Sequence, residues 1–315
     1  MCRKKLIHLH AREYEHPFDR KALEALEATP GLPALVKTVR KYSFDKIQKI
    51  VHTGSYLQIG ENQYPHIYQL FTECCEILDF PSPPPKLYMS QMYEINAYAT
   101  CFAEPIVVIT SGCLDVLSHD EVRFILGHEL GHIKSQHLLY HDLANTIAQI
   151  GSILGDMTLG IGGVLSLGLQ IALLYWQRMS EFTSDRAGLL ASQNYPSTIS
   201  VIAKMAGVTR KDPTELNVAE FMNQVKQFEG FDYDSFDKIA KYYSVMEQSH
   251  PWTVMRAAEL EKWVQSGQYE AILNRKTQRQ QASLTSLHAS VNRCRQCGNP
   301  IGAADRFCGK CGTAV

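Results

Sequence analysis

The segment His128-Glu129-Leu130-Gly131-His132 carries two imidazoles and one carboxylate within five positions. If the segment is helical, side chains four positions apart share one face, so the two histidines can bind a single metal ion through ring nitrogens. Glu129 lies beside that face, where its carboxylate can take a proton from a water molecule whose pKa zinc has lowered. The pattern therefore predicts a zinc-dependent hydrolase, and the alternative is a chance match on an ordinary helix.

A catalytic zinc ion requires a third protein ligand and an open fourth position. Downstream, residues 178–188 read as a helix that carries Glu181 and Asp185 one turn apart. We expect Glu181 to be the third ligand, and Asp185 to accept a hydrogen bond from the outer nitrogen of one histidine and so fix the tautomer of that ring. For Glu181 the alternative is a solvated helix surface. His137 and His141 are interpreted as supporting or surface residues, because they follow on other faces of the first helix.

A helix must hold the metal-binding pair, and the preceding residues mark where such a helix begins. Ser118 and Glu121 have the Ser-x-x-Glu spacing of a capping box, in which each side chain accepts a hydrogen bond from the backbone N–H of the other residue. Apolar residues then recur at the spacing of one buried helix face. We predict a helix from His119 to about Leu139.

Three short stretches of β type precede this helix, at 86–89, 95–101 and 106–110. They follow a proline-rich run at 81–85, which excludes a helix interior or a central strand there. Every residue of 106–110 is β-branched, which is typical of a buried strand or of a strand beside a cleft. Residues 1–80 have helical periodicity, so we expect a helical region that packs on the catalytic domain.

A long uncharged stretch lies between the two predicted metal-binding helices. Asp156 is the single charged residue between Thr146 and Gln177, and the apolar run within this stretch has about the length that spans a bilayer. Its glycines weaken a helix in water but permit close helix packing. Two interpretations stay open for 146–177, which are contact with a membrane and a buried helical hairpin.

Together these motifs resemble the HtpX-type and CaaX prenyl endopeptidase family of gluzincin metallopeptidases, in which His-Glu-Leu-Gly-His is followed by Glu-x-x-x-Asp. The likeness covers roughly residues 30 to 265. The resemblance implies an α+β fold, mostly helical, whose small β-sheet edges the active-site cleft. We assign residues 81–269 to this metallopeptidase domain.

The resemblance also implies roles for residues outside the two metal-binding helices. The matching positions are Asn96, Ala97, Tyr98, His250 and Arg256. The first three would belong to an edge strand whose backbone pairs with an extended substrate. His250 would help to stabilise the oxyanion of the tetrahedral intermediate, and Arg256 would support the site. For His250 the alternative is a residue at a helix N-terminus before a proline.

Four cysteines close to the C-terminus, Cys294, Cys297, Cys308 and Cys311, form two Cys-x-x-Cys pairs. Two such pairs can supply four thiolates to one tetrahedral zinc ion, and the pattern resembles short zinc-ribbon modules. Residues 294–315 are too few to fold by apolar burial alone, so we expect a structural zinc ion to hold them together. A redox function is the alternative, and no binding partner is indicated.

A polar stretch at 270–293, rich in Gln, Ser, Thr and Arg, is expected to link the ribbon to the catalytic domain. The whole chain of 315 residues has 31 basic and 32 acidic residues, so it lacks the excess of positive charge that is typical of nucleic-acid-binding proteins. Its N-terminus lacks the apolar run of a secretory signal, and the cysteine spacing indicates metal binding rather than a disulfide framework. We expect a cytoplasmic protein, with membrane association as an open alternative.

The function that these motifs predict is hydrolysis of peptide bonds in protein or peptide substrates, by a zinc-bound water that Glu129 activates. This requires one catalytic zinc ion in addition to the structural zinc ion of the ribbon. Two other functions stay open, a non-catalytic zinc-stabilised adaptor and a membrane-docking quality-control component. An adaptor has no need of an acid–base group beside the metal, so Glu129→Gln distinguishes it from an enzyme.

Overall fold

The computed structural model describes residues 3–28, 45–101, 104–141, 161–230 and 251–275, and near the C-terminus residues 294–297, 299, 301, 307–308, 311 and 313–314. The chain divides into two compact units, Met1–Leu273 and Asn274–Val315. The first unit contains the predicted metal-binding helices, and the second contains the four clustered cysteines.

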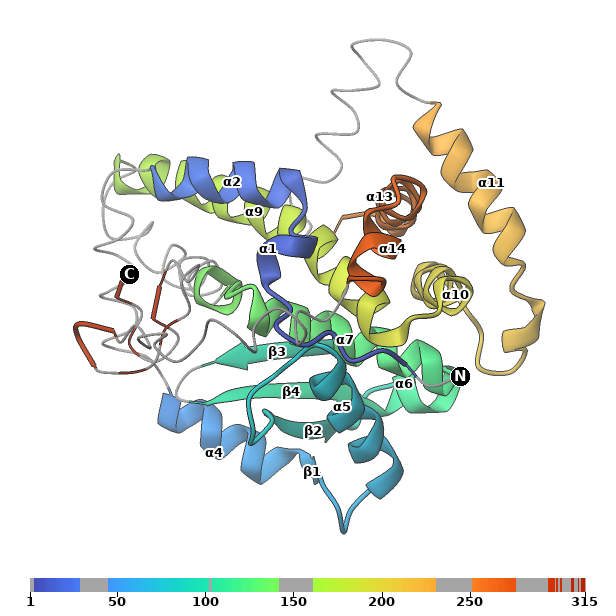
Figure 1. The fold of residues 1–315 in the computed structure, drawn as a ribbon, viewed down its shortest axis with the longest axis horizontal. Coiled ribbons are helices and arrows are strands. Elements are labelled where there is room, and N and C mark those ends of the chain that lie inside the picture. The colour runs from blue at the N-terminus through green and yellow to red at the C-terminus, as the bar shows by residue number, and fades with distance from the viewer. Residues whose placement is uncertain are drawn as a thin grey trace, which may run out of the picture. The chain divides into compact units, whose positions relative to one another are not determined.

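The first unit contains a four-stranded sheet in the order β1-β2-β4-β3 (Figure 1). Its strands are β1 (Leu57–Ile59), β2 (Lys86–Ser90), β3 (Ala97–Cys101) and β4 (Pro105–Thr110). β2 and β4 are parallel, whereas the two outer pairs are antiparallel. The three predicted strands are present, and the mostly helical α+β class is confirmed. β1 was not expected, because the sequence before residue 80 has helical periodicity and a three-residue strand leaves little pattern of its own.

The helix with the paired histidines, α7 (His119–Lys134), begins at the predicted residue. Its capping box is formed, since Ser118 N donates to Glu121 Oε2 at 2.7 Å and Glu121 N donates to Ser118 Oγ at 3.4 Å. Phe124 and Leu126 lie on opposite sides of α7 and are both fully buried, so the helix is covered on more than one side. The cap therefore sets the start of the helix, and packing on both sides of α7 sets which way the histidines point.

The predicted end of this helix was wrong, because α7 ends at Lys134 and not near Leu139. Gln136 adopts a left-handed conformation with φ 60°, and it donates from its backbone N–H to Ile133 O. The N–H of His137 donates to His132 O at 3.0 Å, so the pair of bonds forms a Schellman motif with glutamine where glycine is usual. The chain reverses here and returns His137 to the side of the metal-binding pair.

α9 (Ile161–Ser192) is a long helix that crosses α7, and α7 lies between α9 and the sheet (Figure 1). Small residues bring the two helices close together. A Cβ added at Gly131 would lie 2.6 Å from the Cβ of Ala187, and one added at Gly127 would collide with Ala191 in the same way. The glycine inside the His-Glu-Leu-Gly-His segment is thus required for helix packing, which places the ligands of α9 within reach of those of α7.

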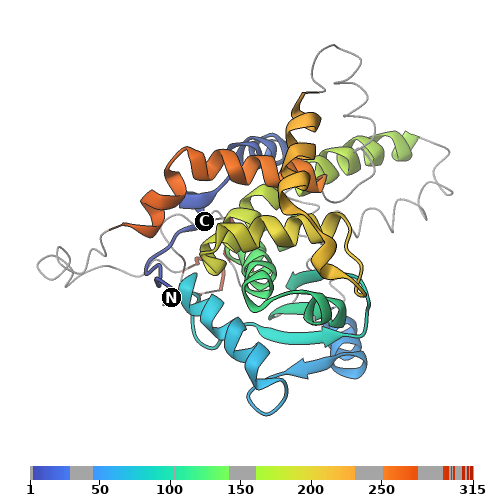
Figure 2. The same cartoon turned by 90° about the vertical axis from the view of Figure 1, so that its right-hand side faces the viewer.

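The remaining described helices complete the first unit. They are α1 (Ala11–Tyr14), α2 (Pro17–Glu27), α4 (Asp45–Ser55), α5 (Pro65–Ile77), α6 (Ser111–Val116), α10 (Tyr195–Ala206), α11 (Val218–Glu229), α13 (Thr253–Gln265) and α14 (Gln268–Leu273), with a short 3-10 turn at Pro213–Glu215. Figures 1 and 2 show α2 beside α9 on the side away from the sheet, and α10, α11 and α13 packed against one another. The N-terminal residues therefore reach the metal-binding helices directly.

No helix among the described residues is long and apolar enough to cross a membrane. Part of the uncharged stretch at 146–177 forms the first half of α9, while residues 142–160 lie outside the described part of the chain.

Candidate metal centre

Three side chains from two helices converge in the first unit, namely His128 and His132 from α7 and Glu181 from α9. The Nε2 atoms of the two histidines lie 3.1 Å apart. Glu181 Oε2 is 3.3 Å from His128 Nε2, and Glu181 Oε1 is 3.2 Å from His132 Nε2. All three residues are at most 5% exposed.

These spacings suit a tetrahedral zinc ion. A tetrahedron whose corners lie about 2.0–2.1 Å from its centre, as nitrogen and oxygen ligands do around zinc, has edges of about 3.3–3.4 Å. The two ring nitrogens lie 3.1 Å apart, and each lies 3.2–3.3 Å from one of the two carboxylate oxygens of Glu181, which is close to that edge length. The donor set of two neutral nitrogens and one carboxylate is also one that zinc prefers, so the residues present fit the ion.

The two histidines of the cluster differ in protonation. Burial lowers the pKa of His128, but the hydrogen bonds and charges of Asp185 and Glu181 outweigh burial and raise that pKa to about 10. Burial lowers the pKa of His132 to about 4, so this second ring is neutral near pH 7. Glu181 and the neutral His132 ring can therefore accept a divalent ion, and His128 joins them when the ion displaces its proton, because metal ligands must be deprotonated.

His128 is supported by Asp185, one turn after Glu181 on α9. Its Nδ1 lies 2.9 Å from Asp185 Oδ1, which leaves Nε2 directed toward the ligand cluster. Arg256 on α13 holds this carboxylate from the other side, with its Nε 2.8 Å from Asp185 Oδ2. Burial raises the pKa of Asp185, but Arg256 and His128 hold it below its usual value. Arg256 thus contacts the supporting carboxylate.

Glu129 lies next to β3, the strand at the end of the sheet. The residue is 7% exposed. Burial raises the pKa of Glu129 to about 7, although the charge of His128 acts to lower it. The backbone N–H of Ala99 donates a hydrogen bond to its carboxylate. A buried carboxyl group that titrates near neutrality, one position away from a metal-ligand candidate, is suited to proton transfer.

The predicted substrate strand, Asn96–Tyr98, falls at the start of β3, and β3 pairs with β4 on one side. Thr110 N donates to Asn96 O at 3.0 Å, so the backbone polar groups of Asn96 and Tyr98 face β4. By the alternation of an antiparallel ladder, those of Ala97 and Ala99 face the other edge, where no described strand lies. Tyr98 Oη contacts His52 Nε2 at 3.2 Å instead of reaching toward the metal centre.

Asp19, beside the metal centre, was not anticipated from the sequence, and His137, which was interpreted as a supporting or surface residue, is buried next to it. His137 Nδ1 lies 3.0 Å from His132 Nδ1, and His137 Nε2 lies 3.0 Å from Asp19 Oδ2. Burial raises the pKa of Asp19, but His137, Thr183 and Trp176 hold it below its usual value. On a helix continued to Leu139 His137 would point away from His132, and nothing near Asp19 in the sequence signals its contact.

His250, the predicted oxyanion-stabilising residue, lies outside the described residues, which resume at Pro251. His141 Nε2 contacts Ser180 Oγ at 3.0 Å and is not part of the ligand triangle. Of the predicted site residues, His128, His132, Glu181, Glu129, Asp185 and Arg256 are thus brought together.

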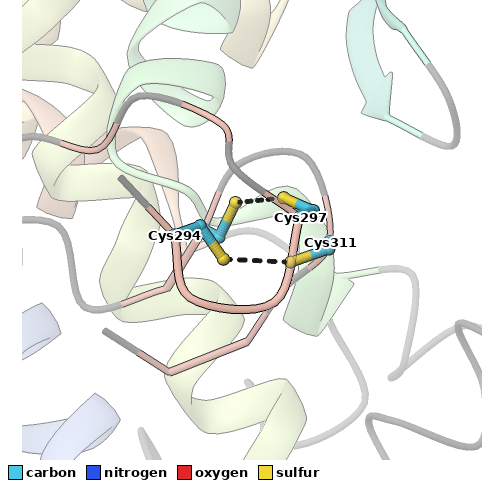
Figure 3. A group of neighbouring side chains, drawn as sticks. Cys294, Cys297 and Cys311 are labelled. Carbon is cyan, nitrogen blue, oxygen red and sulfur yellow. Dashed lines mark hydrogen bonds between the residues drawn. The ribbon is translucent and has the colours of Figure 1, made fainter. Parts of the chain in front are cut away.

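The second unit brings its four cysteines together (Figure 3). Cys294 Sγ lies 3.4 Å from Cys311 Sγ, and Cys297 Sγ lies 3.5 Å from Cys308 Sγ. Two similar turns present them, because Cys294 N donates to Asn299 O and Cys308 N donates to Thr313 O, each at 2.8 Å. None of the four forms a disulfide bond, and their sulfurs lie within 4.8 Å of one another, as a four-thiolate zinc site requires.

Comparison with known proteins gives two family matches. Residues 61–264 match peptidase family M48, and residues 293–315 match a zinc-ribbon domain. The chain is 30% identical over 270 residues to the plastoglobule-localized metallopeptidase 48, chloroplastic, of Arabidopsis thaliana, which covers 85% of this chain and 76% of the plant protein. It is 26% identical over 234 residues to protease HtpX homolog 2 of Methanosarcina acetivorans, covering 67% of this chain and 76% of that protein. No solved structure gives a significant match.

Proposed function

Because the chain belongs to peptidase family M48 and is a metalloprotease, we propose that it cleaves internal peptide bonds at a zinc ion held by His128, His132 and Glu181. The observation that carries this assignment is the buried triangle of these three side chains, in which ring nitrogens and carboxylate oxygens lie 3.1–3.3 Å from one another. Three protein ligands leave the fourth position of a tetrahedral ion for water or substrate, as catalytic zinc sites do.

Proton transfer is assigned to Glu129. When bound, zinc lowers the pKa of a coordinated water and polarises the scissile carbonyl group. Glu129 takes the proton of the attacking water as the new C–O bond forms. It then gives this proton to the amine nitrogen as the C–N bond breaks, so that the carboxylate is regenerated. Its burial supports this role, because a pKa of about 7 permits both directions of transfer near neutral pH.

The substrate is placed along β3. We assign Ala97 as the residue whose N–H and C=O pair with an extended peptide, because both groups face the edge where no described strand lies. Asn96 and Tyr98 pair with β4 and so hold β3 in position at the end of the sheet. Recognition through backbone groups holds a peptide without selecting much of its sequence. Oxyanion stabilisation by His250 stays a prediction from the resemblance, and Arg256 is proposed to act through Asp185.

The second zinc ion is assigned to Cys294, Cys297, Cys308 and Cys311, with a structural role. We propose that residues 294–315 form this ribbon, that 270–293 link it to the catalytic domain at 81–269, and that residues 1–80 support that domain. We infer a reducing, cytoplasmic location from the metal-binding spacing of these cysteines, and fractionation of cells that express the chain tests it.

The zinc content of the purified full chain tests the assignment. We expect two zinc ions per wild-type chain and one in Glu181→Ala, because the variant loses one ligand of the buried triangle. Glu129→Gln should retain both ions and lose peptide hydrolysis by on the order of 10²–10⁴-fold, the usual contribution of a general base. Glu73→Gln, which changes a carboxylate paired with Arg123 on α7, is the matched control.

Two results would overturn the proposal. One is unchanged zinc content in Glu181→Ala, which removes this residue from the ligand set. The other is wild-type proteolysis by Glu129→Gln, which removes the assigned base. If the chain were instead a non-catalytic adaptor, Glu129→Gln would still bind partner proteins, and the wild type would show no proteolysis.

A further inference from the structure

The two candidate histidine ligands are supported from different parts of the chain. Behind His128 lies Asp185, which is inside the region matched by the family model. Behind His132 lies His137, and behind His137 lies Asp19 on α2, before the first matched residue at 61. Asp19, His137 and His132 are 1%, 2% and 4% exposed, so this row of contacts is closed to bulk water.

The donors around Asp19 can be assigned from their chemistry. The indole N–H of Trp176 can only donate, and it lies 3.0 Å from Asp19 Oδ1. Thr183 Oγ accepts from the backbone N–H of His16 at 3.0 Å, so its own proton is free to go to Asp19 Oδ2, 2.6 Å away. With both oxygens accepting, Asp19 also accepts from His137 Nε2. The proton of His137 is therefore on Nε2.

This assignment decides the orientation of His132. In a neutral His137 ring that carries its single proton on Nε2, Nδ1 is an acceptor, and the 3.0 Å contact requires His132 to donate from Nδ1. The Nε2 atom of His132 is then left with a lone pair, and this is the atom that faces His128 and Glu181. The opposite direction would put a proton on His132 Nε2 and prevent it from binding a metal ion.

We propose that Asp19 and His137 are positioning residues for the metal centre, which hold His132 in the one tautomer that can bind zinc. The N-terminal helix α2 thereby completes a site whose ligands lie on α7 and α9. The Schellman turn at Gln136 is the local structure that returns His137 to this position. The inference rests on the proposed zinc site at His128, His132 and Glu181.

Asp19→Asn tests the inference with almost no change of shape. The indole N–H of Trp176 can only donate, so the amide oxygen takes the place of Oδ1. The amide N–H₂ then takes the place of Oδ2, where it faces both Thr183 Oγ and His137 Nε2 and donates to them. His137 must then donate from Nδ1, which forces His132 into the wrong tautomer. We expect the zinc affinity of the buried site to fall about 10–100-fold, the usual effect of losing an outer partner of a ligand.

The matched control is Glu259→Gln. Glu259 Oε2 accepts from His16 Nε2 at 3.0 Å, which is another contact between a buried histidine and a carboxylate, beside the same helix α2. Neither residue touches a member of the ligand triangle. This variant makes the same carboxylate-to-amide change, and we expect its zinc affinity to stay within threefold of the wild type.

The zinc affinity of the full chain is measured by competition with a chelator. Substitution of cobalt for zinc distinguishes the two sites, because the thiolate-to-cobalt absorption band arises from the ribbon cysteines alone. Excess zinc should restore peptide hydrolysis in Asp19→Asn, whereas a purely structural defect would not respond to zinc. His137→Gln removes the imidazole that links Asp19 to His132 and leaves Asp19 its hydrogen bonds from Trp176 and Thr183. This second variant replaces Asp19→Asn in the test if Asp19→Asn does not fold.

Wild-type zinc affinity in either folded variant would overturn the inference. If Glu181→Ala loses zinc while Asp19→Asn keeps it, the metal site stands and only the role of Asp19 and His137 fails. If Glu181→Ala also keeps its zinc, the site assignment itself fails. A loss of affinity in Asp19→Asn that is absent from Glu259→Gln and is rescued by added zinc supports the inference.

Discussion

The metal centre of the first unit and the cysteine cluster of the second differ in what holds their ligands in place. His128, His132 and Glu181 are nearly fully buried on two long helices, and hydrogen-bonded neighbours orient both imidazole rings. The cysteines lie on two short turns, and Cys297 and Cys311 are only partly buried. A hydrophobic core thus holds the first set of side chains in place, whereas the described part of the ribbon has no comparable core, and we expect it to depend on its ion for folding.

Removal of metal should separate the two sites most strongly. Structural zinc stabilises small zinc-binding peptides by about 10–16 kcal/mol, so a chelator should unfold the ribbon. The first unit should keep its helices and lose only activity, because its core does not depend on the ion. Circular dichroism and limited proteolysis of the full chain, with and without a chelator, measure both effects. Loss of most helical signal on chelation would contradict the comparison.

Substitution of a supporting carboxylate should weaken the buried centre without removing a ligand. Asp185→Asn leaves His128 without its charged acceptor and Arg256 without its counter-charge, so we expect zinc affinity to fall about 10–100-fold. Asp120→Asn, which changes another carboxylate held by an arginine, Arg123, is the control and should keep wild-type affinity. Equal affinities for the two variants would mean that the core alone orients the ligands.

Helix packing offers a test with a smaller expected effect. Gly131→Ala places a methyl group against Ala187 and must push α7 and α9 apart, which should cost about 1–3 kcal/mol of unfolding free energy and weaken zinc binding. Gly54→Ala is a matched control in another helix, where an added methyl group meets no atom within 4 Å. Denaturant unfolding compares the two variants. A Gly131→Ala chain as stable as Gly54→Ala would show that the crossing is looser than the structure indicates.

The turn after α7 provides the smallest expected change. Gln136 adopts a left-handed conformation with φ 60°, which glycine adopts without the steric cost that other residues pay. Gln136→Gly should therefore stabilise the first unit by up to about 1 kcal/mol, as measured by thermal unfolding. The metal centre should be unchanged, because His137 keeps its backbone bond to His132. Weaker zinc binding in this variant would show that the glutamine side chain itself contributes.

Local signals account for most of what could be anticipated. The capping box at Ser118 and Glu121 predicted the first residue of α7, because both of its hydrogen bonds form within one turn. The β-branched run near Val107 and Val108 predicted the central strand, because those residues suit a buried, pleated surface. The end of α7 was missed, since a left-handed glutamine leaves no compositional mark.

The candidate metal ligands follow from the sequence alone, since the spacing of two histidines on a helix, of Glu181 and Asp185 on another and of two Cys-x-x-Cys pairs limits the chemistry directly. Only the tertiary structure decided which groups support them. Asp19 and His132 are more than a hundred positions apart, and their link through His137 depends on a chain reversal and on the packing of α2 against α9. Such contacts follow from the burial of whole helices, which no short stretch of sequence encodes.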